Sequence, residues 1–244
     1  MAWIGSLAMF LSLAAPAGAE TAADTLLTVT SHTDAFTAAG TSQPARDAET
    51  RIWVGSGRVR RDENGTSEIF RFDLDKLYLV YHADKSYSEL DLPIAWAKLA
   101  PKGSEHELDQ YIKANAVSVQ LKPTAETRKI RGWKASRVEV EIANASMKLK
   151  TAMWVSKDGG LGALYETYNR MAAIIAALQP GSDAWAQKIE KLDGCPVLQE
   201  TTVELMGTRF KSREELVSAE IRQAPPGTYE VPADYTSKPY EPRP

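Results

Sequence analysis

The chain has 244 residues and a nearly balanced charge, with 29 basic and 32 acidic side chains and a net charge of −3. A nucleic-acid-binding protein normally carries a basic excess or stripe, which this composition lacks, so we expect no nucleic-acid partner. The single cysteine, Cys195, excludes an internal disulfide, so stability must come from a buried core, which a chain of this length can form. Its neighbours Gly194 and Pro196 favour a small buried filler over a reactive thiol.

The chain begins with the pattern of an export signal. An uncharged apolar stretch, 1–15, runs into Pro16-Ala17-Gly18-Ala19, where small residues stand at the positions that a signal peptidase reads. We predict a signal peptide over 1–19, a mature chain from Glu20, and export to the bacterial periplasm. No Lys or Arg precedes the apolar run, although an export signal usually carries positive charge there. The alternative is an uncleaved membrane anchor. About 15 apolar residues, however, fall short of the roughly 20 that span a bilayer. No later stretch is long enough, so we expect no transmembrane segment in the mature chain.

Residues 20–244 have the pattern of a single β-rich domain. Their length, roughly 225 residues, is ordinary for one all-β domain. Apolar and polar side chains alternate strictly in 117–122 and 137–142, which is typical of a strand with one face in the core and one in water. We expect the glutamates of the second strand to face water and these residues to face inward: Val138, Val140 and Ile142.

The same alternation extends to other segments that are separated by turn signals. It places Met147, Leu149, Met153 and Val155 on one face of the next strand, and Phe70, Phe72 and Leu74 on one face of an earlier strand. The turn signals are Asn64-Gly65, 73–76, 83–85 and Arg131-Gly132. These connections are too short for crossover helices, so neighbouring strands should pair antiparallel.

A helical insertion at about 161–193 interrupts the strands. Apolar residues recur at steps of three and four over 161–179, which predicts an amphipathic helix that Pro180-Gly181 ends. Ser182 begins a second, shorter helix. A weaker helical pattern covers 104–114, strands return at 197–206 and 210–222, and a tail rich in Pro and Tyr is expected to extend over the sheet from about 224.

The fold class follows from the amount of apolar strand surface that the predicted helices can bury. Nine or ten strands, by this count, expose more apolar surface than one helical hairpin can bury against a flat sheet. We therefore predict a mainly β fold, a strongly curved antiparallel sheet or incomplete β-barrel, with the 161–178 helix as a lid or plug. The alternative is a two-sheet sandwich with the helices on its rim.

Several segments follow one another in a recognisable order. They are the 51–60 run Arg-Ile-Trp-Val-Gly-Ser-Gly-Arg-Val-Arg, a strand ending in Asp73, Lys85-Ser86-Tyr87, the 129–135 run Lys-Ile-Arg-Gly-Trp-Lys-Ala, Trp154-Val155-Ser156 and, after the helical insertion, Gly194-Cys195-Pro196-Val197. This order resembles a family of bacterial exported proteins of uncharacterised function. That family is similar in layout to the periplasmic lipoprotein-carrier superfamily, whose members fold as an incomplete β-barrel with a helical lid. The resemblance implies a concave hydrophobic cavity that holds acyl chains or lipid.

Methionine and aromatic side chains are the candidates for a ligand cavity, because flexible thioethers adapt to varied apolar ligands. The candidate lining residues are Met147, Leu149, Met153, Leu164, Tyr168, Met171 and Ile175. Glycine and proline at both ends of the helix could permit it to open, and the candidate hinge residues are Gly159, Gly160, Gly162, Pro180 and Gly181. Ordinary core packing is the alternative for both sets. An inward arginine among Arg58, Arg60 and Arg61 could anchor a polar head group, although a solvated face is the simpler interpretation.

No motif indicates a reaction or a cofactor. His32, His82 and His106 lie on separate segments without the spacing of a metal site, and no serine occupies a nucleophile-elbow pattern. We therefore expect a non-enzymatic binding module for an apolar small molecule, acyl chain or lipoprotein, without metal or cofactor. The alternative is an envelope interaction or sensor protein with a filled core and a protein-binding surface; a hydrolase ranks below both.

Overall fold

The computed structural model describes residues 23–38, 40–99 and 103–240, so the predicted signal peptide lies outside the described residues. The strands of the first half are β1 (Thr25–Thr33), β2 (Phe36–Ala38), β3 (Thr41–Gln43), β4 (Arg46–Gly55), β5 (Arg58–Glu63), β6 (Thr66–Arg71), β7 (Lys76–Tyr81) and β8 (Ser86–Asp91). Those of the second half are β9 (Ser118–Ile130), β10 (Trp133–Ala143), β11 (Met147–Ser156), β12 (Cys195–Leu205), β13 (Thr208–Ile221) and β14 (Thr236–Ser237). The helices are α1 (Trp96–Leu99), α2 (Glu105–Asn115), α3 (Leu161–Ala177) and α4 (Asp183–Glu190).

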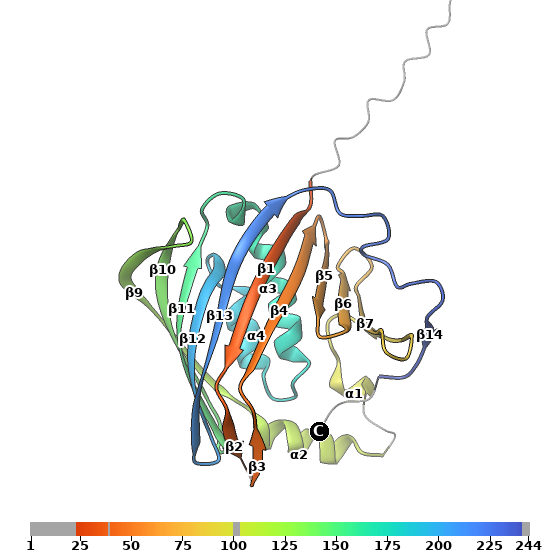
Figure 1. Ribbon diagram of the computed structural model, residues 1–244. Helices are drawn as coiled ribbons and strands as arrows, with labels where there is room; N and C mark the ends of the chain where they lie inside the picture. The colour runs from red at the N-terminus through yellow and green to blue at the C-terminus, as the bar shows by residue number, and fades with distance from the viewer. Residues whose placement is uncertain (1–22, 39, 100–102, 241–244) are drawn as a thin grey trace, which may run out of the picture.

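Twelve strands form one sheet in the order β14-β8-β7-β6-β5-β4-β1-β13-β12-β11-β10-β9, and β2 and β3 form a separate hairpin (Figure 1). All neighbours in the large sheet pair antiparallel except β14, which runs parallel to β8. Two meanders, β4–β8 and β9–β13, meet at β1, which pairs with β4 on one side and β13 on the other. The antiparallel pairing predicted from the short turns is therefore confirmed, and all described strands except β2 and β3 belong to one large hydrogen-bonded sheet.

Helix α3 packs on one face of this sheet and supplies the centre of the main core (Figure 1). Its buried side chains meet inward residues of β1, β4 and β5, including Leu27, Ile52 and Val59. A second core lies farther along the same sheet, where Val138, Val140, Ile142 and Met153 pack with Leu192 and Trp185 beside α4. Some inward strand residues therefore pack against α3 and others pack beside α4. Only those that pack against α3 can reach the candidate site.

The alternation expected for β10 is confirmed: Val138, Val140 and Ile142 are buried, and Glu139 is exposed. The expected shared face of Phe70, Phe72 and Leu74 is only partly correct, because β6 ends at Arg71 and Leu74 lies in the following turn, where it is 50% exposed. Positive φ angles at Asn64 and Gly65, 50° and 77°, fit the predicted tight hairpin.

The weaker helix predicted at 104–114 is present as α2, which has no buried residue. Among the described residues, no helix is both long enough and apolar enough to cross a membrane.

The chain after β13 crosses the opposite face of the sheet. Tyr229 and Val231 pack against Ile69 and Val80 in a third apolar cluster on β6 and β7. The chain then adds β14 to the edge strand β8, and Ser88 donates a hydrogen bond to the carbonyl of Pro239. This segment therefore covers the outer face of the first meander and reaches its edge.

Candidate functional site: a cavity between the sheet and α3

A cavity of about 170 Å³ lies between α3 and the inner face of the sheet. Its apolar wall comes from β1 and β4 on one side and from α3 on the other. The lining side chains are Val29, Thr50, Ile52, Arg61, Tyr168, Met171, Ala172, Ile175, Ile189, Pro196, Gln199 and Glu214. An engineered apolar cavity of about 150 Å³ binds benzene, so this volume suits a ligand segment of about six carbon atoms. Because the wall is mostly apolar and a few polar groups converge on it, the cavity has the composition of a small ligand site.

The polar strand residues of the cavity come from the two halves of the chain. Thr50 is on β4 and Arg61 on β5, whereas Gln199 is on β12 and Glu214 on β13. The amide of Gln199 donates a hydrogen bond to Glu214 at 3.0 Å. Burial raises the pKa of Glu214, against the opposing effects of Arg61 and of the Gln199 hydrogen bond. Burial also raises the pKa of Tyr168 on the facing helix. The cavity therefore combines an apolar wall with a carboxyl group that has lost much of its hydration.

A second hollow, about 550 Å³ in volume, lies at the carboxyl end of α3. Arg61 lines both spaces, and Leu178, Gln179 and Tyr240 border the second. At this boundary Arg61 forms ion pairs with Glu68, at 3.0 Å, and with Glu63. The inward orientation of Arg61 agrees with the alternative in which one arginine of 58–61 faces the core.

The structure brings only part of the predicted cavity lining together. Tyr168, Met171 and Ile175 line the cavity, whereas Leu164 packs in the same core outside the lining. The three predicted strand residues do not reach it: Met153 and Leu149 pack in the second core beside α4, and Met147 lines an open surface hollow near the β10–β11 turn. That part of the predicted grouping is wrong, because β11 lies far enough along the sheet to face α4 rather than α3.

The predicted hinge residues at the ends of α3 differ in how closely they are packed. A side chain at Gly162 would place its Cβ 2.8 Å from the carbonyl oxygen of Lys157. Gly181, with φ +90°, and Pro180 are buried, and a Cβ on Gly181 would lie 2.7–2.9 Å from the backbone of Asn115 and Ala116. A Cβ on Gly159 would have no other atom within 4 Å, and a Cβ on Gly160 would contact only Ile221. Close backbone packing is therefore a sufficient reason for glycine at two of these positions.

A further anchor holds the middle of α3. Asn169 is 1% exposed, and its amide donates to the carbonyls of Leu192, at 2.8 Å, and Gly194. At the carboxyl end, the indole of Trp96 donates to the carbonyl of Ala177 at 3.0 Å. These contacts fix α3 as a wall of the cavity.

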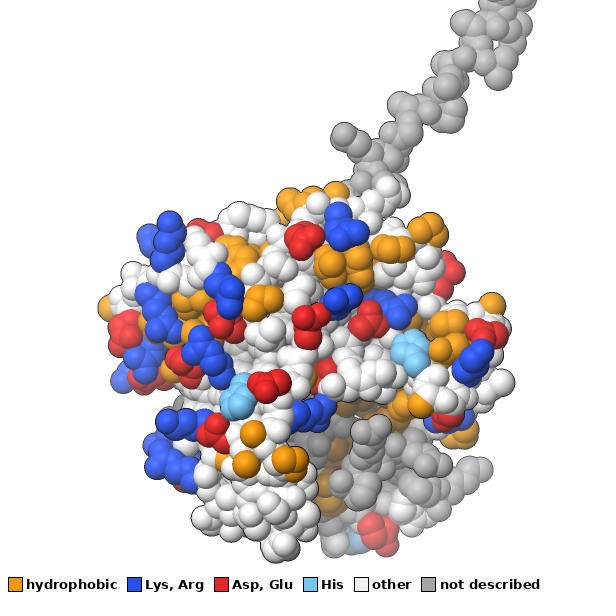
Figure 2. Space-filling model, in the orientation of Figure 1, with side chains coloured by type: hydrophobic (Ala, Val, Ile, Leu, Met, Phe, Trp, Pro, Cys, Tyr) orange, Lys and Arg blue, Asp and Glu red, His pale blue; other side chains and the backbone are white. Residues whose placement is uncertain are grey.

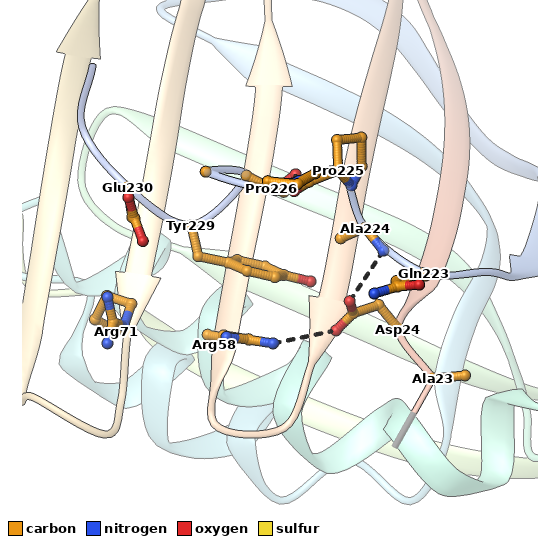
Figure 3. A pocket seen from close by; sticks show the side chains of 12 residues that line it. Ala23, Asp24, Arg58, Arg71, Gln223, Ala224, Pro225, Pro226, Tyr229 and Glu230 are labelled. Atoms are coloured by element: carbon orange, nitrogen blue, oxygen red, sulfur yellow. Dashed lines mark hydrogen bonds and ion pairs between the residues drawn. The ribbon is translucent and has the colours of Figure 1, made fainter. Parts of the chain in front are cut away.

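Another pocket, about 430 Å³ in volume, lies under the carboxy-terminal segment on the outer face (Figure 3). The guanidinium of Arg58 lies 4.5 Å from the ring centre of Tyr229, and Asp24 accepts a hydrogen bond from the backbone N–H of Ala224. Gly55 is required here, because a Cβ would overlap a carboxylate oxygen of Asp24. These contacts attach the segment to the ends of β1 and β4.

A polar network continues this attachment across β5, β6 and β7. Arg60 donates to Ser67 and to the carbonyl of Thr228, at 3.0 Å and 3.2 Å. Ser67 also contacts His82 Nε2 at 2.7 Å, and the other ring nitrogen contacts the Tyr235 hydroxyl at 2.8 Å. Ser67 is 1% exposed, so this serine–histidine contact belongs to a buried network that ties the segment to the sheet.

The remaining chemical candidates from the sequence lie away from the cavity. His32 contacts Asp47 and His106 contacts Gln110, both at exposed positions. In the described part of the chain, no group of three His, Cys, Asp or Glu side chains is placed to hold a metal ion. Cys195 is fully buried, and burial raises the pKa of its thiol to about 12.

Sequence reasoning missed Gln199 and Glu214, since polar residues within alternating strands are normally assigned to the solvent face. The signal that could have revealed Glu214 is the run Arg213-Glu214-Glu215-Leu216, in which strict alternation places Glu214 on the face of buried Leu216.

The comparisons with known proteins identify a family without indicating a function. A search of curated proteins gave no match. A solved structure of PNGF-II in a C2 space group is 11% identical, with a TM-score of 0.42, and the match covers 89% of this chain and 31% of that one. This chain thus spans about a third of that protein, and the likeness is too distant to support an argument. Neither this match nor the family names a lipoprotein carrier. The family model for a domain of unknown function, DUF4412, matches residues 41–235, and the chain belongs to that family.

Proposed function

We propose that this chain is a non-enzymatic binding module of the bacterial periplasm that holds a short apolar segment of an amphiphilic or acylated partner between its sheet and α3. The observation that carries the proposal is the cavity lined by Tyr168, Met171 and Ile175. Apolar walls release ordered water when a ligand covers them, and each buried methylene group contributes about 0.8 kcal/mol. A segment of about six carbons would therefore bind without any covalent chemistry.

The proposal includes a sheet that wraps around α3 as an incomplete barrel. Helix α3 contacts β4, β5 and β12, and β5 and β12 are four positions apart in the strand order. At about 4.8 Å per strand, a flat sheet would place these two strands roughly 19 Å apart, so a helix aligned with the strands and about 10–12 Å wide would not reach both. Curvature of the sheet around the helix accounts for both contacts. The layout is then similar to that of the lipoprotein carriers, with α3 as a plug.

The test is binding of a neutral probe, hexan-1-ol, followed by nuclear magnetic resonance on isotopically labelled protein. In the wild-type protein, hexan-1-ol should shift the methyl signals of Met171 and Ile175, and the shift should saturate as its concentration rises. The variant Met171→Trp fills the cavity and should abolish saturation. Tyr111→Trp adds the same side chain on α2, where Tyr111 is 42% exposed, and should bind like wild type.

Absence of any saturable shift in wild type would refute the binding proposal. The envelope interaction or sensor protein, with a filled core and a protein-binding surface, would then take its place. Equal binding by wild type and Met171→Trp, with Tyr111→Trp unchanged, would place the ligand elsewhere and refute the proposed site.

A further inference from the structure

The surroundings of Arg61 hold more carboxylates than guanidinium groups. Glu63, Glu68 and Glu214 lie near Arg61, and each contributes to the electrostatic environment of its guanidinium. Arg46, the next cation along this edge, lies 3.9 Å from Glu63 and is largely exposed. Of the three carboxyl groups, Glu214 lines the cavity, whereas Glu63 and Glu68 line the neighbouring hollow at the carboxyl end of α3. The low local dielectric around these partly buried groups strengthens charge interactions relative to bulk water.

The positive charge of Arg61 is already compensated by two carboxylates. One terminal nitrogen donates to Glu68 at 3.0 Å and the other to Glu63. A carboxylate that entered the cavity would add a further negative charge beside these two, and it would also meet the carboxyl group of Glu214. An alkyl carboxylate is therefore disfavoured, although a lone inward arginine suggests the opposite specificity.

Within the described part of the chain, Glu214, in contrast to Arg61, lacks a charged hydrogen-bond partner. Its side-chain hydrogen bond comes from a neutral amide, Gln199, and the carboxyl group lines the cavity opposite Met171 and Ile175. A carboxyl group that is buried with a neutral partner gains most from a positively charged donor, because charge-assisted hydrogen bonds are about twice as strong as neutral ones.

Resting on the function proposed above, we propose that the cavity selects amphiphiles with a cationic polar end, such as a primary alkylammonium, over amphiphiles with a carboxylate end. The alkyl segment lies against Met171 and Ile175, and the ammonium group donates to Glu214. The alcohol of the same length binds with intermediate affinity, since it can donate one neutral hydrogen bond.

The experiment compares hexylammonium, hexan-1-ol and hexanoate by nuclear magnetic resonance titration at fixed ionic strength and neutral pH. We expect hexylammonium to bind about tenfold more tightly than hexanoate. Glu214→Gln keeps the size of the side chain and should reduce the affinity for hexylammonium severalfold, and by clearly more than it reduces the affinity for hexan-1-ol. Glu215→Gln is the matched control, because Glu215 is the next residue on β13 and pairs with Arg131 and Arg213 on the outer face.

The outcomes separate the two proposals. If hexan-1-ol binds but hexanoate binds as tightly as hexylammonium, the cationic preference is wrong and the binding function stands. If hexylammonium binds Glu214→Gln and wild type equally, the ammonium group contacts another acidic surface and the assignment to Glu214 is wrong. If none of the three ligands gives a saturable shift, the binding function itself fails.

Discussion

Val140 offers a sensitive test of the second core, because it is 4% exposed and lies opposite Leu121 on β9 and Thr151 on β11. Val140→Asp removes an apolar contact worth about 1.5–3 kcal/mol and places a carboxylate without a partner beside Met153. Even with relaxation of the neighbours, we expect a loss of at least about 3 kcal/mol, since an unpaired buried polar group adds a comparable penalty. With an m value of about 2–3 kcal/mol/M, the urea midpoint should fall by 1 M or more.

The matched control is Glu139→Gln on the same strand, where Glu139 is exposed and only 3.4 Å from the partly exposed Arg137. Its free energy of unfolding should change by less than about 0.5 kcal/mol, because exposed ion pairs contribute little. The deficit of Val140→Asp should shrink on acidification, since burial favours the neutral form of the new carboxyl group. Equal midpoints for the two variants in urea melts would refute the inward orientation of Val140.

Three further outcomes are expected. Gly55→Ala should cost about 2 kcal/mol in urea unfolding, because its Cβ overlaps Asp24, and an unchanged midpoint would contradict that packing. Burial raises the pKa of Cys195 to about 12, so a thiol reagent at pH 8 should label Cys195 only after unfolding, and rapid labelling of folded protein would contradict its burial. Glu214 faces Arg61, Glu63, Gln199 and Tyr168, and burial raises its pKa in the folded protein. Ionised Glu214 therefore destabilises the fold, and this effect grows as pH rises through the folded-state pKa. In urea melts from pH 4 to 8, Glu214→Gln should lose less stability with rising pH than wild type does. Equal slopes of stability against pH for the two proteins would contradict the raised pKa.

Local patterns predicted the strands and their faces because alternation and turn chemistry act over a few residues. The strict alternation of 137–142 placed Val138, Val140 and Ile142 correctly, and Asn64-Gly65 marked a hairpin. These local patterns could not predict the pairing of β1 with β13, because it joins residues 179 to 196 positions apart, from Thr33–Ser212 to Thr25–Ile221. That pairing brings the two meanders into one sheet.

The site was predictable only where the helix alone decides it. The spacing of Tyr168, Met171 and Ile175 follows from the period of α3, and all three line the cavity. Which strand residues face them depends on the position of each strand in the sheet, and Met153 faces α4 instead. Arg61 and Glu214 were missed as a pair because they come together only through β4, β1 and β13.

The central claim is that the space under α3 binds the apolar part of an amphiphile. The most direct measurement is a crystal structure of the protein with 6-bromohexan-1-ol, in which anomalous scattering locates the bromine. The account predicts a single bromine peak in the cavity, within contact of Met171 and Ile175, and loss of that peak in Met171→Trp crystals. A peak only on the outer face or in the pocket beneath Tyr229, with an empty cavity under α3, would contradict it.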